Sequence, residues 1–179
     1  MSSLPDSCAL NLELKARVAD LVQARVVARQ LTTRPMEELV QLDTYFQCDT
    51  GRFKLRQFDS ERGQLIWYQR ASQHQAKSSF YKLVDIFRPE EMKNLLATTL
   101  GIRVVVQKQR EVYFYRNVRI HLDQVQSLGT FLEFEAVLEN ADQIPLGQKQ
   151  LDFLCSQFSI ADQDLMEGSY SEMLEDGGK

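Results

Sequence analysis

Alternation of polar and apolar residues is the feature of this sequence that most restricts its fold. In the segment NLELKARV, residues 11–18, four apolar residues alternate with Asn11, Glu13, Lys15 and Arg17. Successive side chains of a β-strand point to opposite faces, so this period of two predicts a strand with one buried face. The polar face carries one acid and two cations, which an ordinary solvent-facing strand does not require.

The same period of two recurs along most of the chain, in runs that are separated by turn residues. The runs cover residues 11–18, 41–48, 52–58, 63–70, 78–87, 102–110, 111–116, 118–125 and 130–138. Their regular spacing predicts about eight short strands in an antiparallel meander, and a barrel or a sandwich is the architecture that such spacing favours. The fold class is therefore α+β and predominantly β.

Helical spacing is confined to a few segments between and after these runs. Asp20 is well placed as an N-cap of the first helix, Pro89 at the first turn of the second, and Gly101 at its C-terminal cap. The helices are expected over residues 19–31, from Pro89 to Gly101, over 147–158, and as a short element around 163–174. The chain is expected to form a single domain, residues 1–179, with a core of about 10–158 and an acidic C-terminal segment of 159–179.

Composition excludes several classes of protein. The net charge of −4 argues against non-specific nucleic-acid binding, and no apolar run approaches the length of a membrane span. Three widely separated cysteines and two isolated histidines offer neither a disulfide framework nor a zinc site. The N-terminus lacks the pattern of a secretory signal, so a cytoplasmic location is expected. The sequence also has no GxGxxG, P-loop or GxSxG motif and no repeat.

Charged residues on the polar faces of the predicted strands follow a pattern of their own. The cations are Lys15, Arg17, Arg52, Lys54, Arg56, Arg70, Lys108, Arg110 and Arg119, and the carboxylates are Glu13, Asp123, Glu133 and Glu135. A sheet with one solvated face would also alternate, and each strand taken alone fits that explanation. Pairs of cations at spacing two recur on three strands, however, and such pairs repel unless an anion lies between them.

A closed barrel explains this recurrence better, because it turns the charged faces into a shared lumen and the apolar faces outward beneath helices. Eight strands leave a lumen able to hold one small ligand. A lumen with clustered cations and several carboxylates suits a polyanion with a hard divalent cation, such as a triphosphate with magnesium.

The sequence resembles the CYTH family of triphosphate tunnel metalloenzymes, which includes class IV adenylyl cyclases, thiamine triphosphatases and inorganic triphosphatases. The resemblance covers roughly residues 10–174, and the stretch 119–135 is most similar to the cyclase-like branch. It rests on eight segments in order: NLELKARV, LDTYF, GRFKLR, LIWYQR, AKSSFY, VQKQR, RIHLDQVQSLGTFLEFE and LMEGSY. The fold that it implies is an eight-stranded antiparallel closed β-barrel, or triphosphate tunnel, with helices packed outside.

The resemblance also implies roles for individual residues. It assigns the catalytic Mg²⁺ or Mn²⁺ to Glu13, Glu133 and Glu135, with Asp123 as a further ligand or supporting acid. The residues implied to hold the phosphates are Lys15, Lys54, Arg56, Lys77, Lys108, Arg110 and Arg119. Lys15, Glu13 and Arg56 are the implied catalytic residues.

Several residues near these positions receive other expectations. The family signature is ExExK, and here asparagine stands at its first position, so Asn11 puts the number of bound metals in doubt. Arg17 and Arg70 are weaker candidates for the phosphate site, and Arg52 is expected in solvent near a turn. His121 is expected to be a packed or supporting group rather than a catalytic base. Tyr68 is expected either to line the lumen or to be an ordinary half-buried tyrosine.

The implied activity is conversion of ATP to cyclic AMP and pyrophosphate, as in class IV adenylyl cyclases. The alternative is a triphosphatase that hydrolyses thiamine triphosphate, inorganic tripolyphosphate or a nucleoside triphosphate. A second alternative is a non-catalytic module that binds a nucleotide or polyphosphate, which the loss of a metal-binding acid at Asn11 would permit. The expected partner is the small-molecule triphosphate, with no nucleic acid and no membrane, and a homodimer is an option that the family allows.

Overall fold

Eight antiparallel strands make up most of the computed structural model of the chain, which describes residues 9–70 and 77–177. Each strand follows one of the alternating segments of the sequence. The strands are β1 (Ala9–Arg17), β2 (Glu37–Phe46), β3 (Arg52–Gln57), β4 (Arg62–Arg70), β5 (Lys77–Phe87), β6 (Ile102–Tyr115), β7 (Val118–Val125) and β8 (Gly129–Leu138).

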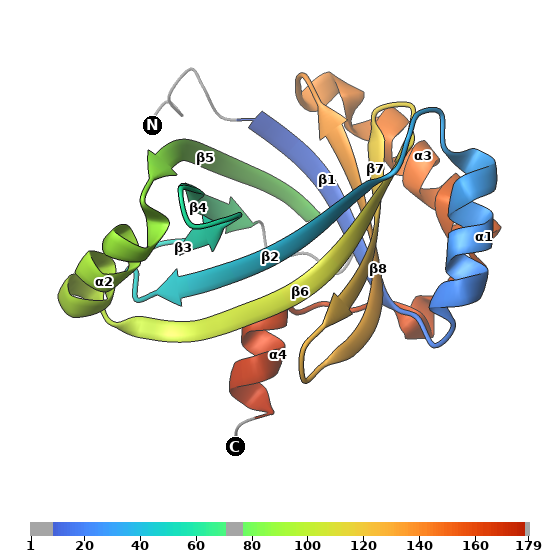
Figure 1. The fold of residues 1–179 in the computed structure, drawn as a ribbon. Coiled ribbons are helices and arrows are strands. Elements are labelled where there is room, and N and C mark those ends of the chain that lie inside the picture. Colours follow the sequence, from blue (N-terminus) through green and yellow to red (C-terminus); the bar gives the residue numbers. More distant parts are fainter. Residues whose placement is uncertain (1–8, 71–76, 178–179) are drawn as a thin grey trace.

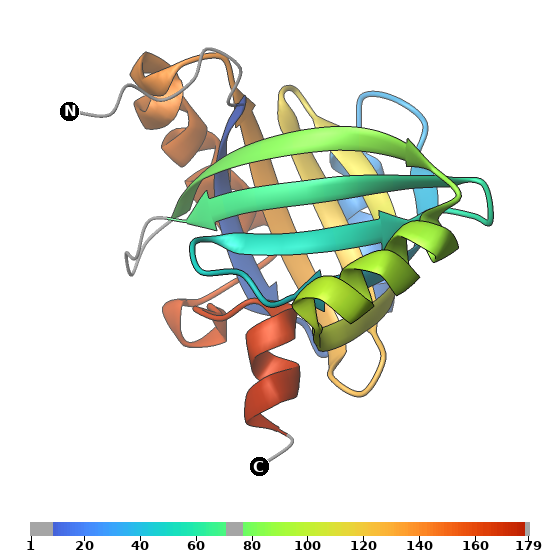
Figure 2. The same cartoon turned by 90° about the vertical axis from the view of Figure 1, so that its left-hand side faces the viewer.

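The strands form a closed barrel in the order β1-β5-β4-β3-β2-β6-β7-β8. The barrel closes because β1 pairs with β5 on one side and with β8 on the other, where Lys15 lies opposite Glu133. In Figures 1 and 2, β3, β4 and β5 cross one side of the barrel, and β1, β7 and β8 form the opposite side. The predicted antiparallel barrel is confirmed, and its closure leaves no free sheet edge among these strands.

One strand is longer than the sequence predicts. The runs 102–110 and 111–116 were expected to be separate, but β6 continues through both. It is held along its length because its first part pairs with β2 and its second part with β7, where Arg110 lies opposite Asp123. Adjacent polar residues at Arg110 and Glu111 do not end a strand that has partners on both sides.

Helices cover two sides of the barrel. They are α1 (Leu21–Leu31), α2 (Pro89–Leu100), α3 (Ile144–Gln157) and α4 (Tyr170–Asp176), with short 3₁₀ helices at Ala141–Gln143 and Asp162–Asp164. Asp20 caps α1 by accepting hydrogen bonds from the backbone N–H groups of Val22 and Gln23 at 2.9 and 3.0 Å, as predicted. Pro89 opens α2, and Gly101 ends it with a φ of 80°, a conformation that favours glycine.

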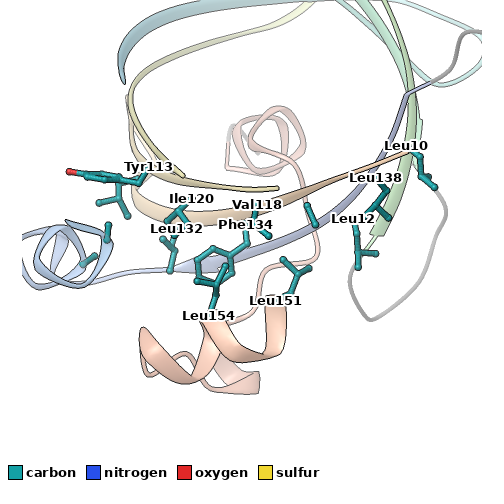
Figure 3. Close-up of a cluster of buried hydrophobic side chains, with 14 residues drawn as sticks. Leu10, Leu12, Tyr113, Val118, Ile120, Leu132, Phe134, Leu138, Leu151 and Leu154 are labelled. Carbon is teal, nitrogen blue, oxygen red and sulfur yellow. The ribbon is translucent and has the colours of Figure 1, made fainter. Parts of the chain in front are cut away.

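The main hydrophobic core lies outside the barrel, between its wall and two helices. Figure 3 shows Ile120, Leu132 and Phe134 of the wall facing Leu151 and Leu154 of α3, and all five side chains are buried. Ala24 and Ala28 of α1 belong to the same cluster, and Figure 1 shows α1 and α3 on the outer side of β1, β7 and β8. The apolar faces of these strands therefore point outward under helices, which leaves their polar faces for the interior.

The C-terminal segment turns back beneath the barrel, where α4 lies in Figures 1 and 2. Leu165 forms an isolated antiparallel bridge with Ala16, and the backbone N–H of Met166 donates to the carbonyl oxygen of Lys15 at 2.8 Å. The helix expected around 163–174 is present as α4 but begins later, at Tyr170, with Ser169 as its N-cap. Within the described residues, no helix has the length and apolar character that a membrane-spanning helix requires.

Candidate functional site: a charged lumen

A cavity of about 260 Å³ occupies the interior of the barrel. Nine of the eleven residues predicted for the site line it: Glu13, Lys15, Lys54, Arg56, Lys108, Arg110, Arg119, Glu133 and Glu135. Lys54, Lys108 and Arg110 are only 8%, 4% and 8% exposed, so these cations do not lie on a solvated exterior. The interpretation of the alternating charges as an ordinary water-facing surface is thereby excluded for the central residues.

Asp43 of β2 holds three of the predicted phosphate-binding cations together. Its carboxylate accepts hydrogen bonds from Lys54 Nζ at 2.7 Å and from Arg56 Nε and Nη2 at 2.7 and 2.8 Å. Lys108 Nζ lies 3.5 Å from the same carboxylate. Burial alone would raise the pKa of Asp43, but Arg56, Lys54 and Lys108 outweigh it and hold the pKa well below its ordinary value.

No role was predicted for Asp43 from the sequence, although a signal for one was present. Gln41, Asp43 and Tyr45 alternate in the segment 41–48 in the same way as the charged residues of the other strands. Gln41 and Asp43 lie opposite Lys108 and Arg56 in the register of β2 with its neighbours. One acid between two uncharged residues did not stand out in the sequence, and only the pairing of β2 with β3 and β6 gives it three cationic neighbours.

A second ionic cluster joins β6, β7 and the C-terminal segment. Both oxygens of Asp123 accept hydrogen bonds from Arg110, each at 2.6 Å, and Tyr170 Oη donates to Oδ2 of Asp123 at 2.7 Å. Burial raises the pKa of Asp123, but Arg110 dominates and the net direction is downward. Asp123 therefore orients Arg110 and Tyr170 in this structure.

Glu133 of β8 contacts side chains of three other strands, β1, β6 and β7. It lies 2.9 Å from Lys15 Nζ, 3.6 Å from Arg110 Nη2 and 3.3 Å from His121 Nδ1. His121 is 4% exposed, and burial together with Arg110 lowers its pKa. The neutral imidazole that this environment favours is packed beside Glu133.

Glu13 and Glu135 form an acidic corner where β1 meets β8. They lie directly opposite each other in the register of the two strands, and Arg119 Nη1 donates to Glu135 Oε2 at 3.1 Å. The amide nitrogen of Asn11 donates to Glu135 Oε1, which leaves the Asn11 amide oxygen buried without a hydrogen-bond partner. This corner thus gathers carboxylate oxygens and one unsatisfied amide oxygen, the donors that Mg²⁺ and Mn²⁺ prefer.

The described residues do not contain a complete metal cage, because no three His, Cys, Asp or Glu groups among them are arranged around one point. Glu133 and Asp123 form ion pairs with Lys15 and Arg110. Their roles as metal ligands stay predictions. Magnesium is commonly held by one or two carboxylates together with substrate phosphates. The corner of Glu13, Glu135 and Asn11 fits that mode of binding.

Tyr170 closes one side of the cavity. Its ring lies 4.9 Å from that of Phe131, and Lys15 Nζ lies 3.8 Å from its ring centre. Tyr45, Tyr68 and Phe131 belong to the same buried cluster as Tyr170. The position of Tyr170 could not be inferred from alternation, because this residue reaches the lumen from the C-terminal segment rather than from a strand.

The acidic C-terminal segment is fixed to the barrel by arginines. Glu172 of α4 pairs with Arg52, and Glu175 accepts from Arg103 Nη2 at 2.6 Å. The expectation that Arg52 lies in solvent is wrong, since its side chain is 19% exposed and is held by Glu172. The physical reason is again the return of the C-terminal segment, which supplies an acid beside the turn before β3.

The remaining candidates are placed as follows. Arg17 is exposed, and its Nη1 lies 3.3 Å from the carbonyl oxygen of Leu128. Tyr68 is 8% exposed and lines the cavity. Lys77 begins β5 and Arg70 ends β4, but their side chains fall outside the described residues, so their predicted roles stay predictions.

The chain belongs to the CYTH family, because the family profile described as the CYTH domain matches residues 9–170. This membership makes it one of the triphosphate tunnel proteins, which act on triphosphates with a divalent cation. No match was found among curated proteins.

Solved structures share the fold at low sequence identity. A protein from Pyrococcus horikoshii OT3 is 20% identical with a TM-score of 0.74, over 90% of this chain and 98% of that one. A proposed adenylate cyclase from Vibrio parahaemolyticus is 18% identical with a TM-score of 0.73, over 94% and 99%. A chain of the Mediator head module from Schizosaccharomyces pombe is 9% identical with a TM-score of 0.60, over 84% and 94%. At these identities the likeness extends to the fold alone.

Proposed function

We propose that the protein is a divalent-metal-dependent enzyme that converts ATP to cyclic AMP and pyrophosphate inside the lumen, as class IV adenylyl cyclases do. The observation that carries the proposal is the gathering of six cations from four strands around one cavity, opposite an acidic corner. These cations are Lys15, Lys54, Arg56, Lys108, Arg110 and Arg119. Polyanionic phosphates are the ligands that such a set of donors matches.

The balance of charge favours a metal–triphosphate complex over a bare triphosphate. Five carboxylates accompany the six cations in the described lumen: Glu13, Asp43, Asp123, Glu133 and Glu135. The described side chains of the lumen therefore carry only a small excess of positive charge. A bare triphosphate carries several negative charges, whereas a divalent cation neutralises two of them and leaves a complex closer to what the lumen can balance.

Phosphoryl transfer depends mainly on positioning and on neutralisation of charge, which the lumen residues supply. Arg56 and Arg110 are fixed by two hydrogen bonds each to Asp43 and Asp123, so their guanidinium groups are oriented before a ligand arrives. Glu13, Glu135 and the Asn11 amide oxygen would hold Mg²⁺ or Mn²⁺, which when bound neutralises charge on the phosphate oxygens. In the cyclase reaction the ribose 3′-hydroxyl attacks the α-phosphorus and pyrophosphate leaves.

Incubation of the purified protein with ATP and either Mg²⁺ or Mn²⁺ tests the proposal directly. Formation of cyclic AMP and pyrophosphate supports the cyclase. Release of phosphate from ATP, thiamine triphosphate or tripolyphosphate without cyclic AMP would instead establish a triphosphatase, in which water attacks the terminal phosphorus at the same site. Binding of these compounds without any turnover would establish the non-catalytic module. The observation that favours this module is that residues 9–70 and 77–177 form no complete metal cage.

Replacement of the two corner acids should abolish turnover while leaving binding of phosphate detectable. We expect Glu13→Gln and Glu135→Gln each to lower metal-dependent turnover by at least about 100-fold. Replacing a residue that only supports a metal ligand already lowers metal affinity or activity by up to about 100-fold. Glu139→Gln, which changes an exposed acid just after β8, is the matched control and should retain full activity. Full activity in both corner variants would show that the metal does not bind at this corner.

Triphosphate binding should weaken as the pH rises above 7. Burial lowers the pKa of Lys108 to about 7, with Arg110, Arg56 and Lys54 adding to this effect and Asp43 opposing it. A bound phosphate favours the charged amine and raises its pKa, so binding above pH 7 takes up a proton. The affinity should then fall with rising pH by up to about tenfold per pH unit.

This dependence can be measured by calorimetry between pH 7 and 9, above the last ordinary phosphate pKa of about 6. Lys108→Arg is the control, because arginine stays protonated throughout this range and should make the profile flat. An unchanged slope in this variant would show that another group takes up the proton.

The cytoplasmic location and the homodimer stay predictions from the sequence.

A further inference from the structure

The C-terminal part of the chain crosses one end of the barrel and reaches the lumen from there. Residues 165–176, here called the strap, contact the end of β1 and the starts of β3 and β6, and Figures 1 and 2 show α4 below the barrel. Among the described residues, Ser169 and Tyr170 of the strap are the only ones outside the eight strands that line the cavity. The strap is therefore part of the site as well as part of the fold.

Lys15 is held by the strap at both its backbone and its side chain. The backbone N–H of Met166 donates to the Lys15 carbonyl oxygen at 2.8 Å, and Lys15 Nζ lies 3.8 Å from the centre of the Tyr170 ring. A cation over an aromatic face is attracted to it, and the attraction is stronger where water is excluded. Release of the strap would remove both contacts from this cation.

Arg110 is held by the strap indirectly, through Asp123. The same carboxylate oxygen, Oδ2 of Asp123, accepts from Arg110 Nη2 at 2.6 Å and from Tyr170 Oη at 2.7 Å. Asp123 is completely buried, so its position depends on these protein donors rather than on bulk water. Glu133 offers Arg110 a second acid, 3.6 Å from Nη2. The Tyr170 hydroxyl thus helps to keep Asp123 where both of its oxygens face the guanidinium.

The strap is held more weakly than the barrel that it closes. α4 has seven residues, and isolated helices shorter than about 12–15 residues are marginal in water, so α4 depends on its contacts with the barrel. One of these contacts is the ion pair of Glu172 with Arg52. Another is the ion pair of Glu175 with Arg103, whose side chains are 28% and 36% exposed, and exposed pairs contribute little. Such an element can open locally without global unfolding.

From these contacts we propose that the strap is a latch that controls the triphosphate site. When the strap is docked, Tyr170 acts as a positioning residue. Its hydroxyl fixes Asp123 and, through Asp123, the guanidinium of Arg110, while its ring holds Lys15. When the strap is released, Arg110 and Lys15 lose this orientation and the phosphates bind more weakly. This inference rests on the proposed function, because it takes Arg110 and Lys15 as phosphate-binding residues, and it adds a regulatory element to that site.

Docking of the strap and binding of the phosphates must then favour each other, because such coupling is reciprocal. The amides of Met166 and Met173 report docking, since they donate to the carbonyl oxygens of Lys15 and Ser169. We expect saturating Mg²⁺–tripolyphosphate to slow hydrogen exchange of both amides by about tenfold and to leave that of Thr32, the C-cap of α1, unchanged. Unchanged exchange at Met166 and Met173, in protein that calorimetry shows to be saturated, would overturn the inference and leave the phosphate site standing.

Two variants break the same surface ion pair of the strap while changing the net charge in opposite directions. Arg103→Gln and Glu175→Gln should both speed exchange at Met166 and Met173 in the free protein by about twofold to fivefold, the effect of losing an exposed pair. A shared acceleration supports the latch, because a general effect of charge would have opposite signs in the two variants. Acceleration in only one of them, or in neither, would show that this pair does not hold the strap and would contradict the latch.

Tyr170→Phe tests the positioning role, because it removes the hydroxyl and keeps the ring. We expect it to weaken binding of Mg²⁺–tripolyphosphate by about tenfold in the wild-type background and by less than about twofold in Arg110→Lys, since an ammonium has no planar fork for Asp123 to orient. Tyr115→Phe is the matched control, because Tyr115 stacks on Phe153 outside the barrel, and it should bind as the wild type does. Thermal unfolding checks the fold of each variant.

An equal loss in the two backgrounds would show that Tyr170 acts independently of Arg110 and would overturn the positioning role. Wild-type affinity in Tyr170→Phe would overturn it too. If Arg110→Lys binds too weakly for the comparison, the exchange experiment decides. If the wild type binds neither tripolyphosphate nor ATP, the proposed function fails as well.

Discussion

Asp43→Asn should lower the free energy of unfolding by about 3–5 kcal/mol, the usual cost of removing one partner from a buried ion pair. Asp43 is 1% exposed and is the shared counter-ion of Lys54, Arg56 and Lys108. Its replacement leaves three neighbouring cations that repel one another. Urea-induced unfolding measures the change, and Asp49→Asn is the control, because Asp49 is exposed and its replacement should cost no more than about 0.5 kcal/mol.

A polyanion should reverse much of this loss. Tripolyphosphate brings negative charge to the cations that Asp43 no longer neutralises, so it should raise the melting temperature of Asp43→Asn by more than that of the wild type. Equal stabilisation of the two proteins would mean that the phosphate binds elsewhere. An unchanged unfolding free energy in the variant would show that Asp43 does not hold the cations together.

Lys54→Ala and Arg56→Ala should each weaken triphosphate binding by about 1.5–3 kcal/mol, the contribution of a hydrogen bond to a charged group. Either change leaves Asp43 with two other cations, so the fold should persist. Arg56 should have the larger effect, because its guanidinium is held in place by two hydrogen bonds to Asp43. Calorimetric titration with a metal–triphosphate complex measures both losses.

Lys82→Ala is the matched control for these two variants. It removes the same single charge from an exposed position of β5, so long-range electrostatic attraction changes similarly while the lumen does not. Its affinity should stay within about twofold of the wild type. A loss in Lys82→Ala equal to that in Lys54→Ala would show that net charge, and not contact in the lumen, governs binding.

The barrel and its inward-facing charges could be predicted because both follow from local alternation. A period of two fixes which residues share a face, and that face was assigned correctly for Lys54, Lys108 and Arg110, which are buried in the lumen. The end of a strand is harder to predict. Partners on both sides extended β6 through Arg110 and Glu111, where the sequence suggested a break.

The parts of the site that were missed depend on contacts between distant segments. Tyr170 reaches Asp123, which is 47 residues away in the sequence, and Glu172 reaches Arg52 from 120 residues away. The alternation of residues within one strand carries no information about contacts between distant segments. Asp43 was missed for a related reason, because its importance comes from the cations of β3 and β6 that sheet pairing brings to it.

The uncharged residues Ile66 of β4 and Leu83 of β5, which line the cavity, were also not recognised from the sequence. Ile66 and Leu83 belong to runs in which both faces carry apolar residues, so alternation alone could not tell which of them face the lumen. Sheet register resolves this, since Ile66 and Leu83 lie in one row with Lys54. The charge pattern thus locates the cationic part of the lumen, while the assembled barrel is needed to locate its uncharged part.

A crystal structure of the protein with tripolyphosphate and Mn²⁺ tests the central claim most directly. The claim is that the cations of the lumen bind the phosphates of the substrate. Phosphate oxygens should lie within hydrogen-bonding distance of Lys54, Arg56 and Arg110, with Mn²⁺ between the phosphates and the corner of Glu13 and Glu135. A phosphate density on the outer surface, or a lumen that keeps its ionic pairs and excludes the ligand at saturating concentration, would contradict the claim.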